Sequence, residues 1–285
     1  NGLIGKNPAF SIANVEAPTW RAYVLTPFAA ALASLAGIFF QKATLDLREK
    51  QKRPGKIPGW LKPAIGAALA WGIGASVFFV TGHLGVFSLG YGDLSAGLNH
   101  QLTWKIIGVL LFAKLLATVL CYGYGGCGGI FSPTLFFGGM SGLLLAGVVG
   151  FVFPMPAEDA LTLAVVGMSA CLGAVVRAPV TGILIVFEMT HEFSLVPALM
   201  LGALVSQAIS RKMNKENFYD ALLTDDGHQI EHVRPPRDLQ SWHQLPVSAI
   251  ANFKPVVLSG LEREQIQEIL KSPYSRFPVI KESKI

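Results

Sequence analysis

The segment Gly123–Pro133 reads GYGGCGGIFSP, and its five glycines cannot continue a helix. The glycines run directly into an apolar stretch, where Pro133 sits near the expected first helical turn and its missing N–H costs nothing. The N–H groups of Ile130 and Phe131 would then lack helical partners, and the positive end of the helix dipole would face the residues before them. The pattern predicts either an anion site made from backbone alone or a tight glycine turn between packed helices.

The composition around this segment is that of a membrane protein. Apolar residues make up 52% of the 285 residues, and only seven charged residues lie between positions 103 and 210. Ordinary soluble domains carry about 25% charged residues, whereas 21 charges in residues 211–285 are typical of a soluble segment. Three cysteines in apolar or glycine-rich surroundings exclude a secreted disulfide scaffold. The net charge of +5 comes without interleaved aromatic and basic residues, so no nucleic-acid partner is expected.

The apolar runs predict an all-α polytopic membrane protein with broken, tilted helices. Some runs are long enough to cross about 30 Å of hydrocarbon, whereas others are too short and end at Gly, Pro or Arg. Helix ends at that depth must face protein, water or an ion, so function is expected where they meet. The expected helical runs are 20–47, 63–82, 104–122, 131–153, 161–176, 179–189, 195–209 and a short one at 219–223.

The charges that flank or interrupt these runs predict orientation and local roles. Basic clusters at 48–56 and 211–215 predict cytoplasmic ends for the runs that they follow. Lys114 lies in the middle of the third run, where it is either functional or neutralised by helix ends and a partner. The structural role is the favoured expectation for Lys114.

A second informative stretch extends from Gly167 to Thr190. Small residues near its start predict close helix packing, and Arg177 with Pro179 breaks the run. Arg177 is expected to bind carbonyl groups at the C-terminal end of a helix rather than an anion. Glu188 is either a proton carrier or a hydrogen-bonded structural acid, and the sequence does not separate these two roles.

The end of the chain has a different character from the membrane part. Residues 224–241 are polar and read as a linker. Within residues 242–285, strand patterns flank an amphipathic helix in the order β-α-β, and the sequence stops before such a unit could close a core. The expected organisation is a membrane domain at 1–223, this linker, and a partial α/β unit.

Three motifs in this order resemble the CLC family of chloride channels and chloride/proton exchangers. Gly129-Ile130-Phe131-Ser132-Pro133 resembles the family's GxFxP signature, and 167–190 resembles the helices that follow it. The segment 217–223 resembles the last membrane helix, whose tyrosine faces the central anion. Residues 242–285 are similar to the start of a CBS domain.

The resemblance implies an inverted-repeat fold, of which this chain holds mainly the second half, and a homodimer with one anion pathway per subunit. It implies that the N–H groups of Ile130 and Phe131 and the hydroxyl of Tyr219 bind chloride. It assigns Gly129, Ser132 and Pro133 to the selectivity motif. The implied function is transport of small monovalent anions in a lipid bilayer, with no enzymatic step, metal or cofactor. The CBS-like unit could bind an adenine nucleotide, but no residue in this sequence can be named for that role.

The mechanism of transport stays open between a voltage- or proton-gated channel and a chloride/proton antiporter. The family's GSGIP and GxEGP motifs, which carry a serine ligand and the gating glutamate, are expected to precede residue 1, as is the paired-glutamate segment of exchangers. Because half of the anion site is then missing, these residues alone are not expected to form a working pathway.

Two alternatives belong to other classes of protein. A broken-helix secondary transporter for another substrate would prefer an organic solute or a cation. The segment 228–232, HQIEH, matches the H-x-x-E-H pattern of a zinc metalloprotease. That chemistry needs a helix and a third ligand, and the segment lies in the polar linker, so the protease is disfavoured.

Overall fold

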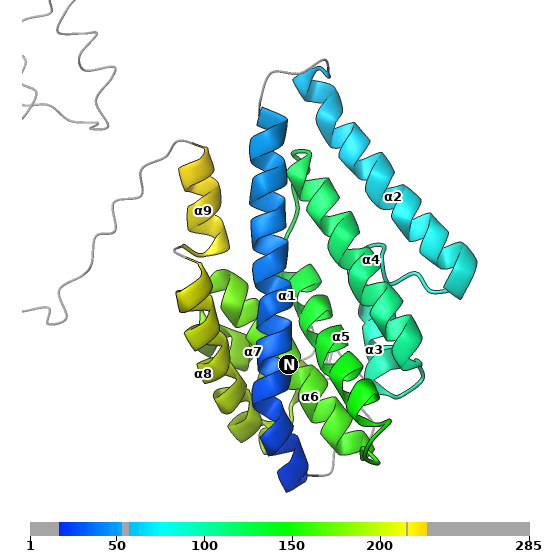
Figure 1. Cartoon of the computed structure of the whole chain (residues 1–285), viewed down its shortest axis with the longest axis vertical. Helices are drawn as coiled ribbons and strands as arrows, with labels where there is room; N and C mark the ends of the chain where they lie inside the picture. Colours follow the sequence, from blue (N-terminus) through cyan, green and yellow to red (C-terminus); the bar gives the residue numbers. More distant parts are fainter. Residues whose placement is uncertain (1–16, 53–56, 215, 227–285) are drawn as a thin grey trace, which may run out of the picture. The chain divides into compact units, whose positions relative to one another are not determined.

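The computed structural model describes residues 17–52, 57–214 and 216–226, and every regular element within them is helical (Figure 1). The α-helices are α1 (Trp20–Lys52), α2 (Lys62–Thr81), α3 (Tyr91–Leu98), α4 (Trp104–Gly123), α5 (Phe131–Val149), α6 (Ala157–Val176), α7 (Pro179–Thr190), α8 (Val196–Met213) and α9 (Phe218–Asp225). Two short 3₁₀ turns, Gly59–Leu61 and Phe193–Leu195, precede α2 and α8.

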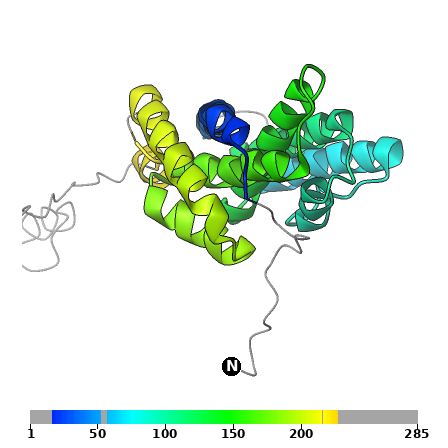
Figure 2. The same cartoon turned by 90° about the horizontal axis from the view of Figure 1, so that it is seen from below.

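Helix α6 is the centre of the bundle. Every residue from Asp159 to Val175 is buried, which is typical of a helix that is apolar all round. The helices α1, α5, α7 and α8 contact it, and Figure 2 shows α1 nearly end-on at one side of this group. Helix α2 lies at the edge of the bundle and packs mainly on α4.

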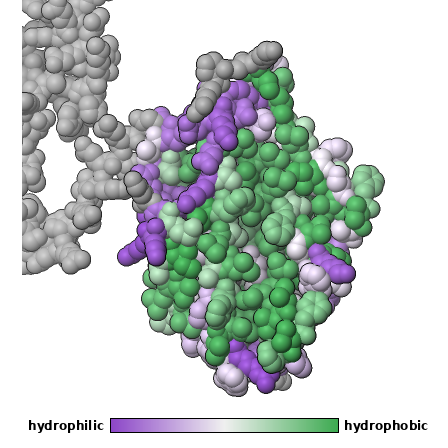
Figure 3. All heavy atoms as spheres, in the orientation of Figure 1, coloured by the Kyte–Doolittle hydropathy of each residue, from purple (hydrophilic) through white to green (hydrophobic). Residues whose placement is uncertain are grey.

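The outer surface of the bundle is apolar. Figure 3 shows apolar residues over most of one face, and many large apolar side chains are exposed, among them Trp71, Phe79 and Phe112. Six helical segments of the described residues are long and apolar enough to cross a membrane. Helix α7 has 12 residues and is too short to do so. The prediction of an all-α membrane fold that mixes spanning and interrupted helices is therefore confirmed.

Several helix bounds differ from those expected. Helix α1 continues through the first basic residues to Lys52, because charged side chains at its end are paired with α9. Helix α5 ends at Val149 instead of residue 153. Helix α6 begins at Ala157 instead of residue 161, because the buried carboxylate of Asp159 accepts hydrogen bonds from the N–H and hydroxyl of Thr19 at 2.9 and 2.6 Å.

The expected linker and terminal unit fall almost wholly outside the described residues. Helix α9 continues to Asp225, two residues past the expected end of the membrane domain. The chain divides into the units Asn1–Ile230 and Glu231–Ile285, and the described residues all belong to the first. The predicted strands and helix of 242–285 therefore stay predictions.

Helices α5 and α6 cross with their backbones in direct contact. A Cβ atom added to Gly138 would lie 2.1 Å from the carbonyl oxygen of Gly167, and one added to Gly142 would lie 2.1 Å from that of Leu163. Only a glycine fits at such distances. The close packing predicted around Gly167 is confirmed, and it lets two apolar helices approach more closely than side chains would allow.

Lys114 is buried in α4, and its ammonium is neutralised by backbone carbonyl groups. Its Nζ donates to the carbonyl oxygens of Gly85 at 2.9 Å and Ser88 at 2.7 Å, in the segment between α2 and α3. It also lies 5.2 Å from the centre of the Phe136 ring on α5. The expected structural role of Lys114 is confirmed. The groups that neutralise it are carbonyl oxygens of a loop, whereas helix ends were expected.

The α5–α6 contact predicts a specific steric cost. We expect Gly142→Ala to lower the free energy of unfolding by about 1–3 kcal/mol, because the new methyl group meets the backbone of Leu163. Denaturant unfolding followed by tryptophan fluorescence measures the change. Gly72→Ala is the matched control, since a Cβ there meets nothing within 4 Å and should leave stability unchanged or raise it slightly. Equal losses in both variants would contradict the assigned contact.

The buried ammonium gives a second prediction. Lys114→Met keeps an unbranched side chain but leaves the carbonyl oxygens of Gly85 and Ser88 without their donor. We expect the free energy of unfolding to fall by about 1–3 kcal/mol, the cost of unsatisfied buried acceptors. The same unfolding assay applies. Lys105→Met, which changes an exposed lysine of the same helix, should have no effect, and an unchanged stability in Lys114→Met would contradict its structural role.

Candidate functional site

The glycine-rich segment brings the chain from α4 to the start of α5 by a sharp local turn. Gly125 has a φ of +92°, which favours glycine, and the N–H of Gly126 donates to the carbonyl oxygen of Cys121 at 2.9 Å. A Cβ on Gly126 would lie 2.7 Å from that same oxygen. The segment therefore needs glycine both for its backbone conformation and for its close approach to the end of α4.

The start of α5 has free backbone donors. Its first backbone bond runs from the N–H of Thr134 to the carbonyl oxygen of Ile130 at 3.1 Å. Among the described residues, no hydrogen bond from the N–H of Ile130 or of Phe131 is found. The side chain of Ile130 is buried, so the position of this helix start is well fixed. The free donors and the helix dipole make the start of α5 favourable for negative charge.

A pocket of about 130 Å³ lies at this helix start. Ile130, Phe131 and the half-exposed Tyr219 all line it, although α5 and α9 are far apart in the sequence. The structure thus brings together the three residues that the resemblance assigned to chloride. The complete lining is Ile130, Phe131, Leu172, Val176, Ala178, Thr181, Ile185 and Tyr219.

Helix α7 also contributes to the pocket, which the sequence did not predict. Ala178 immediately precedes α7, and Thr181 lies in its first turn. The first turns of α5, α7 and α9 therefore share one pocket, so three positive helix ends act on it. Pro179 at the first helical position signals the start of α7 in the sequence, but no sequence signal places that start beside Phe131.

Tyr219 is positioned by the contacts of its neighbours in the chain. The side chain of Asn217 caps α9 by accepting a hydrogen bond from the N–H of Asp220 at 2.9 Å. Phe218 is fully buried and stacks on Phe40 of α1 with ring centres 5.4 Å apart. These contacts fix the first turn of α9, which carries Tyr219 at the pocket.

The remaining residues of the expected selectivity motif lie around the helix start without lining the pocket. The hydroxyl of Ser132 donates to the carbonyl oxygen of Leu89 at 3.0 Å, and this side chain is mostly buried. Ser132 thus attaches α5 to the segment before α3. Pro133 occupies the first turn of α5, and Gly129 is exposed, with no heavy atom within 4 Å of an added Cβ.

Arg177 and Glu188 differ strongly in their surroundings. Arg177 ends α6 with a φ of +60°, and its guanidinium donates to the carbonyl oxygen of Asn214 at 2.6 Å, just after the end of α8. This is the geometry of a residue that binds carbonyl groups at a helix end. The side chain of Glu188 is 78% exposed and lies 3.8 Å from His191, outside the pocket.

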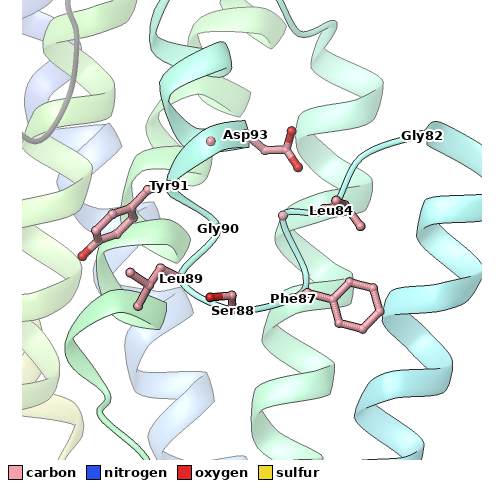
Figure 4. Close-up of a pocket in the computed structure, with 10 residues that line it drawn as sticks. Gly82, Leu84, Phe87, Ser88, Leu89, Gly90, Tyr91 and Asp93 are labelled. Carbon is pink, nitrogen blue, oxygen red and sulfur yellow. The ribbon is translucent and has the colours of Figure 1, made fainter.

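A larger pocket, of about 520 Å³, lies between the end of α2 and the start of α3 (Figure 4). Residues between Gly82 and Asp93 line it, and one of them, Asp93, carries a carboxylate that lies 2.9 Å from Nδ1 of His83. Lys114 binds carbonyl oxygens of this same segment, which also holds Ser132 through Leu89. The segment therefore supports the start of α5 from the side opposite α9.

Within the described ranges, no cluster of three or more His, Cys, Asp or Glu residues could hold a metal ion. The H-x-x-E-H segment at 228–232 lies outside those ranges.

Comparisons with known proteins agree on one family. The family described as voltage-gated chloride channel matches residues 1–211. The "Voltage-gated ClC-type chloride channel ClcB" of Salmonella typhimurium is 34% identical over 134 residues, which cover 47% of this chain and 32% of that protein. The protein of the same name from Escherichia coli strain SMS-3-5 has the same identity and coverage. The chain spans about a third of the length of these curated relatives.

The comparison with solved structures supports the same fold. The chain is similar to a solved structure described as "X-ray crystal structure of a slow cyanobacterial Cl-/H+ antiporter", with a TM-score of 0.63 and 22% sequence identity. The similarity covers 78% of this chain and 51% of that one.

The contact of Ser132 gives a prediction about the frame of the pocket. We expect Ser132→Ala to lower the free energy of unfolding by about 1 kcal/mol, because the partly buried hydrogen bond between the hydroxyl of Ser132 and the carbonyl oxygen of Leu89 is lost. The same unfolding assay measures this. Ser76→Ala is the control, since the exposed hydroxyl of Ser76 bonds only within its own helix, to Gly72. A loss in Ser76→Ala as large as in Ser132→Ala would contradict a specific role for the Ser132 contact.

Proposed function

The chain belongs to the family of voltage-gated chloride channels, and from this premise we propose that it is the part of a multi-pass membrane protein that binds and passes small monovalent anions, chloride foremost. The observation that carries the proposal is the pocket where the free N–H groups of Ile130 and Phe131 lie beside Tyr219. The relatives are named as chloride channels and the structural neighbour is described as a Cl⁻/H⁺ antiporter, which supports the same substrate class.

The chemistry of the pocket suits an anion with a single charge. Free amide donors and converging helix ends supply partial positive charges, which attract an anion without holding it as tightly as a buried ammonium would. The other walls include Leu172, Val176 and Ile185, which cannot replace the hydration shell of a divalent anion such as sulfate. We propose that this combination favours chloride and similar halides.

The rest of the pathway is proposed to come from residues that are not part of this chain. The chain spans about a third of its curated relatives, so other segments would supply the opposite wall and the gate. We further propose a homodimer with one pathway per subunit, and a CBS-like regulatory role for residues 242–285. The pocket is compatible with both a gated channel and a proton-coupled antiporter, and Glu188, which lies outside it, is not proposed as the proton carrier.

We also propose that the basic clusters at 48–56 and 211–215 lie on the cytoplasmic side. The contact of Arg48 with Asp226 supports this, because it places the end of α1 beside the end of α9, on the side where α8 also ends. Positive residues near short apolar segments favour the cytoplasmic face.

The test of the proposal is reconstitution of the full-length protein in vesicles, with chloride flux and proton movement measured together. Chloride flux without proton movement identifies a channel, and coupled movement of both identifies an antiporter. Transport of a cation or an organic solute with no chloride flux would overturn the proposal in favour of a different secondary transporter.

The pocket predicts a specific effect of the Tyr219 hydroxyl. We expect Tyr219→Phe to weaken chloride binding about two- to tenfold, the net contribution of an ordinary hydrogen bond, because water can take over part of the contact in a half-exposed site. Isothermal titration calorimetry of the purified full-length protein with chloride measures this. Tyr23→Phe, which removes a hydroxyl from α1 away from the pocket, is the control. Unchanged binding in Tyr219→Phe would remove Tyr219 from the anion site.

A further inference from the structure

Helix α9 depends on α1 for its position. With eight residues it is too short to be stable by itself, so tertiary contacts must hold it. On α1, Phe40, Arg48 and Lys52 follow one another at spacings of eight and four residues and so share one face, and together with Gln41 they provide these contacts. Phe40 stacks on Phe218, and the Nε2 of Gln41 donates to the carbonyl oxygen of Glu216 at 3.1 Å. These contacts hold the first turn of α9.

The last turn of α9 is held by a group of four charges, which we call the charge clamp (Arg48, Lys52, Asp225 and Asp226). The guanidinium of Arg48 donates to both carboxylate oxygens of Asp226 at 2.9 Å, and its Nε lies 3.2 Å from the carboxylate of Asp225. The Nζ of Lys52 lies 2.6 Å from Asp225 and 3.0 Å from Asp226. Each cation therefore contacts both acids.

The clamp differs from an ordinary surface ion pair. Isolated exposed pairs contribute little to stability, whereas several charges that form a network are an exception. Here the single nitrogen Nη2 of Arg48 serves both oxygens of Asp226, and two cations share two acids. The side chains are only 20–41% exposed, so solvent screens them partially. Hydrogen bonds from Lys52 and Arg48 hold the pKa of the Asp226 carboxyl below its ordinary value, so it stays charged at neutral pH.

The two attachments of α9 lie on either side of its functional residue. Phe218 precedes Tyr219, and the acids of the clamp follow it by less than two helical turns. If the last turn is released, a helix this short can tilt or fray, which moves the tyrosine away from the pocket. The basic end of α1 thus reaches the anion pocket through α9 without lining it.

We propose that Arg48 and Lys52 are positioning residues for the anion pocket: by binding Asp225 and Asp226 they hold α9 in the place where Tyr219 lines it. The inference rests on the proposed function, because its effect is on anion binding. Neither cation lines the pocket, and the positive charges of both are balanced by the two acids.

The first test removes one cation at a time in the full-length protein. We expect Arg48→Gln to weaken chloride binding about twofold in titration calorimetry, and by less than Tyr219→Phe does, because a helix α9 that is docked for only part of the time loses only part of the contribution of the tyrosine hydroxyl. Hydrogen–deuterium exchange at residues 218–225 should become faster in the same variant. Lys50→Gln is the matched control, since it removes a positive charge from the same helix end without a contact to the clamp. A loss of affinity in Lys50→Gln equal to that in Arg48→Gln would mean a general charge effect and overturn the proposal.

The second test asks whether the effect passes through the tyrosine. In a Tyr219→Phe background, Arg48→Gln should change chloride affinity much less than it does alone, because the hydroxyl that the clamp positions is absent. Full additivity of the two changes would contradict positioning of this hydroxyl by the clamp. If Arg48 contributed only to stability, Arg48→Gln would destabilise the protein, and its effect on chloride affinity would be the same with and without the Tyr219 hydroxyl.

The third test restores the clamp with reversed charges. Because each cation contacts both acids, all four charges must be reversed together. Arg48→Asp with Lys52→Asp, and Asp225→Lys with Asp226→Arg, should each weaken chloride binding, and the variant that combines all four changes should recover most of it. No recovery, together with normal exchange at 218–225, would overturn the proposal. Should Arg48→Gln fail to fold, Lys52→Gln replaces the more exposed cation and carries the same expectation.

The outcomes separate the inference from the function on which it rests. If the unaltered full-length protein binds no chloride, the proposed function fails and this inference fails with it. Suppose instead that chloride binds and that Tyr219→Phe weakens the binding, while Arg48→Gln and Lys52→Gln change neither the chloride affinity nor the hydrogen–deuterium exchange at residues 218–225. In that case only the inference is overturned.

Discussion

The backbone contact between α5 and α6 is the constraint on which the rest of the bundle depends. Because Gly138, Gly142 and Gly167 have no side chains, two apolar helices meet carbonyl to Cα, and the axis of α5 has no freedom to shift. Helix α6 is buried from Asp159 to Val175, so it cannot move away to relieve such a contact. The free amides at the start of α5 and the break at Arg177, where α6 ends, are thereby held at the same pocket.

Two further sets of contacts hold the elements around that pocket in place. Both include polar or charged side chains, which are rare in this apolar bundle. On one side, Lys114 donates hydrogen bonds to carbonyl groups of the segment between α2 and α3, and Ser132 bonds the start of α5 to this same segment. On the other side, the face of α1 that begins at Phe40 holds α9. In the low-dielectric interior the contacts of Lys114 are strong and directional. The charged contacts between α1 and α9 are partly exposed and act together as a network.

The sequence predicted those features that depend on local chemistry. Helices end or begin at the glycines of 123–129 and at Pro179. In apolar surroundings a buried cation needs carbonyl groups as partners, and both Arg177 and Lys114 have them. It did not predict features that depend on distant partners. Helix α6 begins early because Asp159 is bound by Thr19, and Ser132 is bound to Leu89, while Thr181 joins the pocket only through the packing of α7. For the pocket itself, periodicity gave no information, and the resemblance of short motifs supplied the three residues.

The unpaired donors at the start of α5 belong to the main chain, and this has an evolutionary consequence. A codon change at position 130 or 131 alters what surrounds these amides but retains the amides themselves, unless it introduces proline. Natural selection can therefore adjust these donors only through the residues that orient the peptide groups, such as Ser132, Lys114 and the glycines of α5. Divergence in ion preference between descendants of such a chain would be recorded in the lining side chains and in the supporting frame, while the donors stay the same.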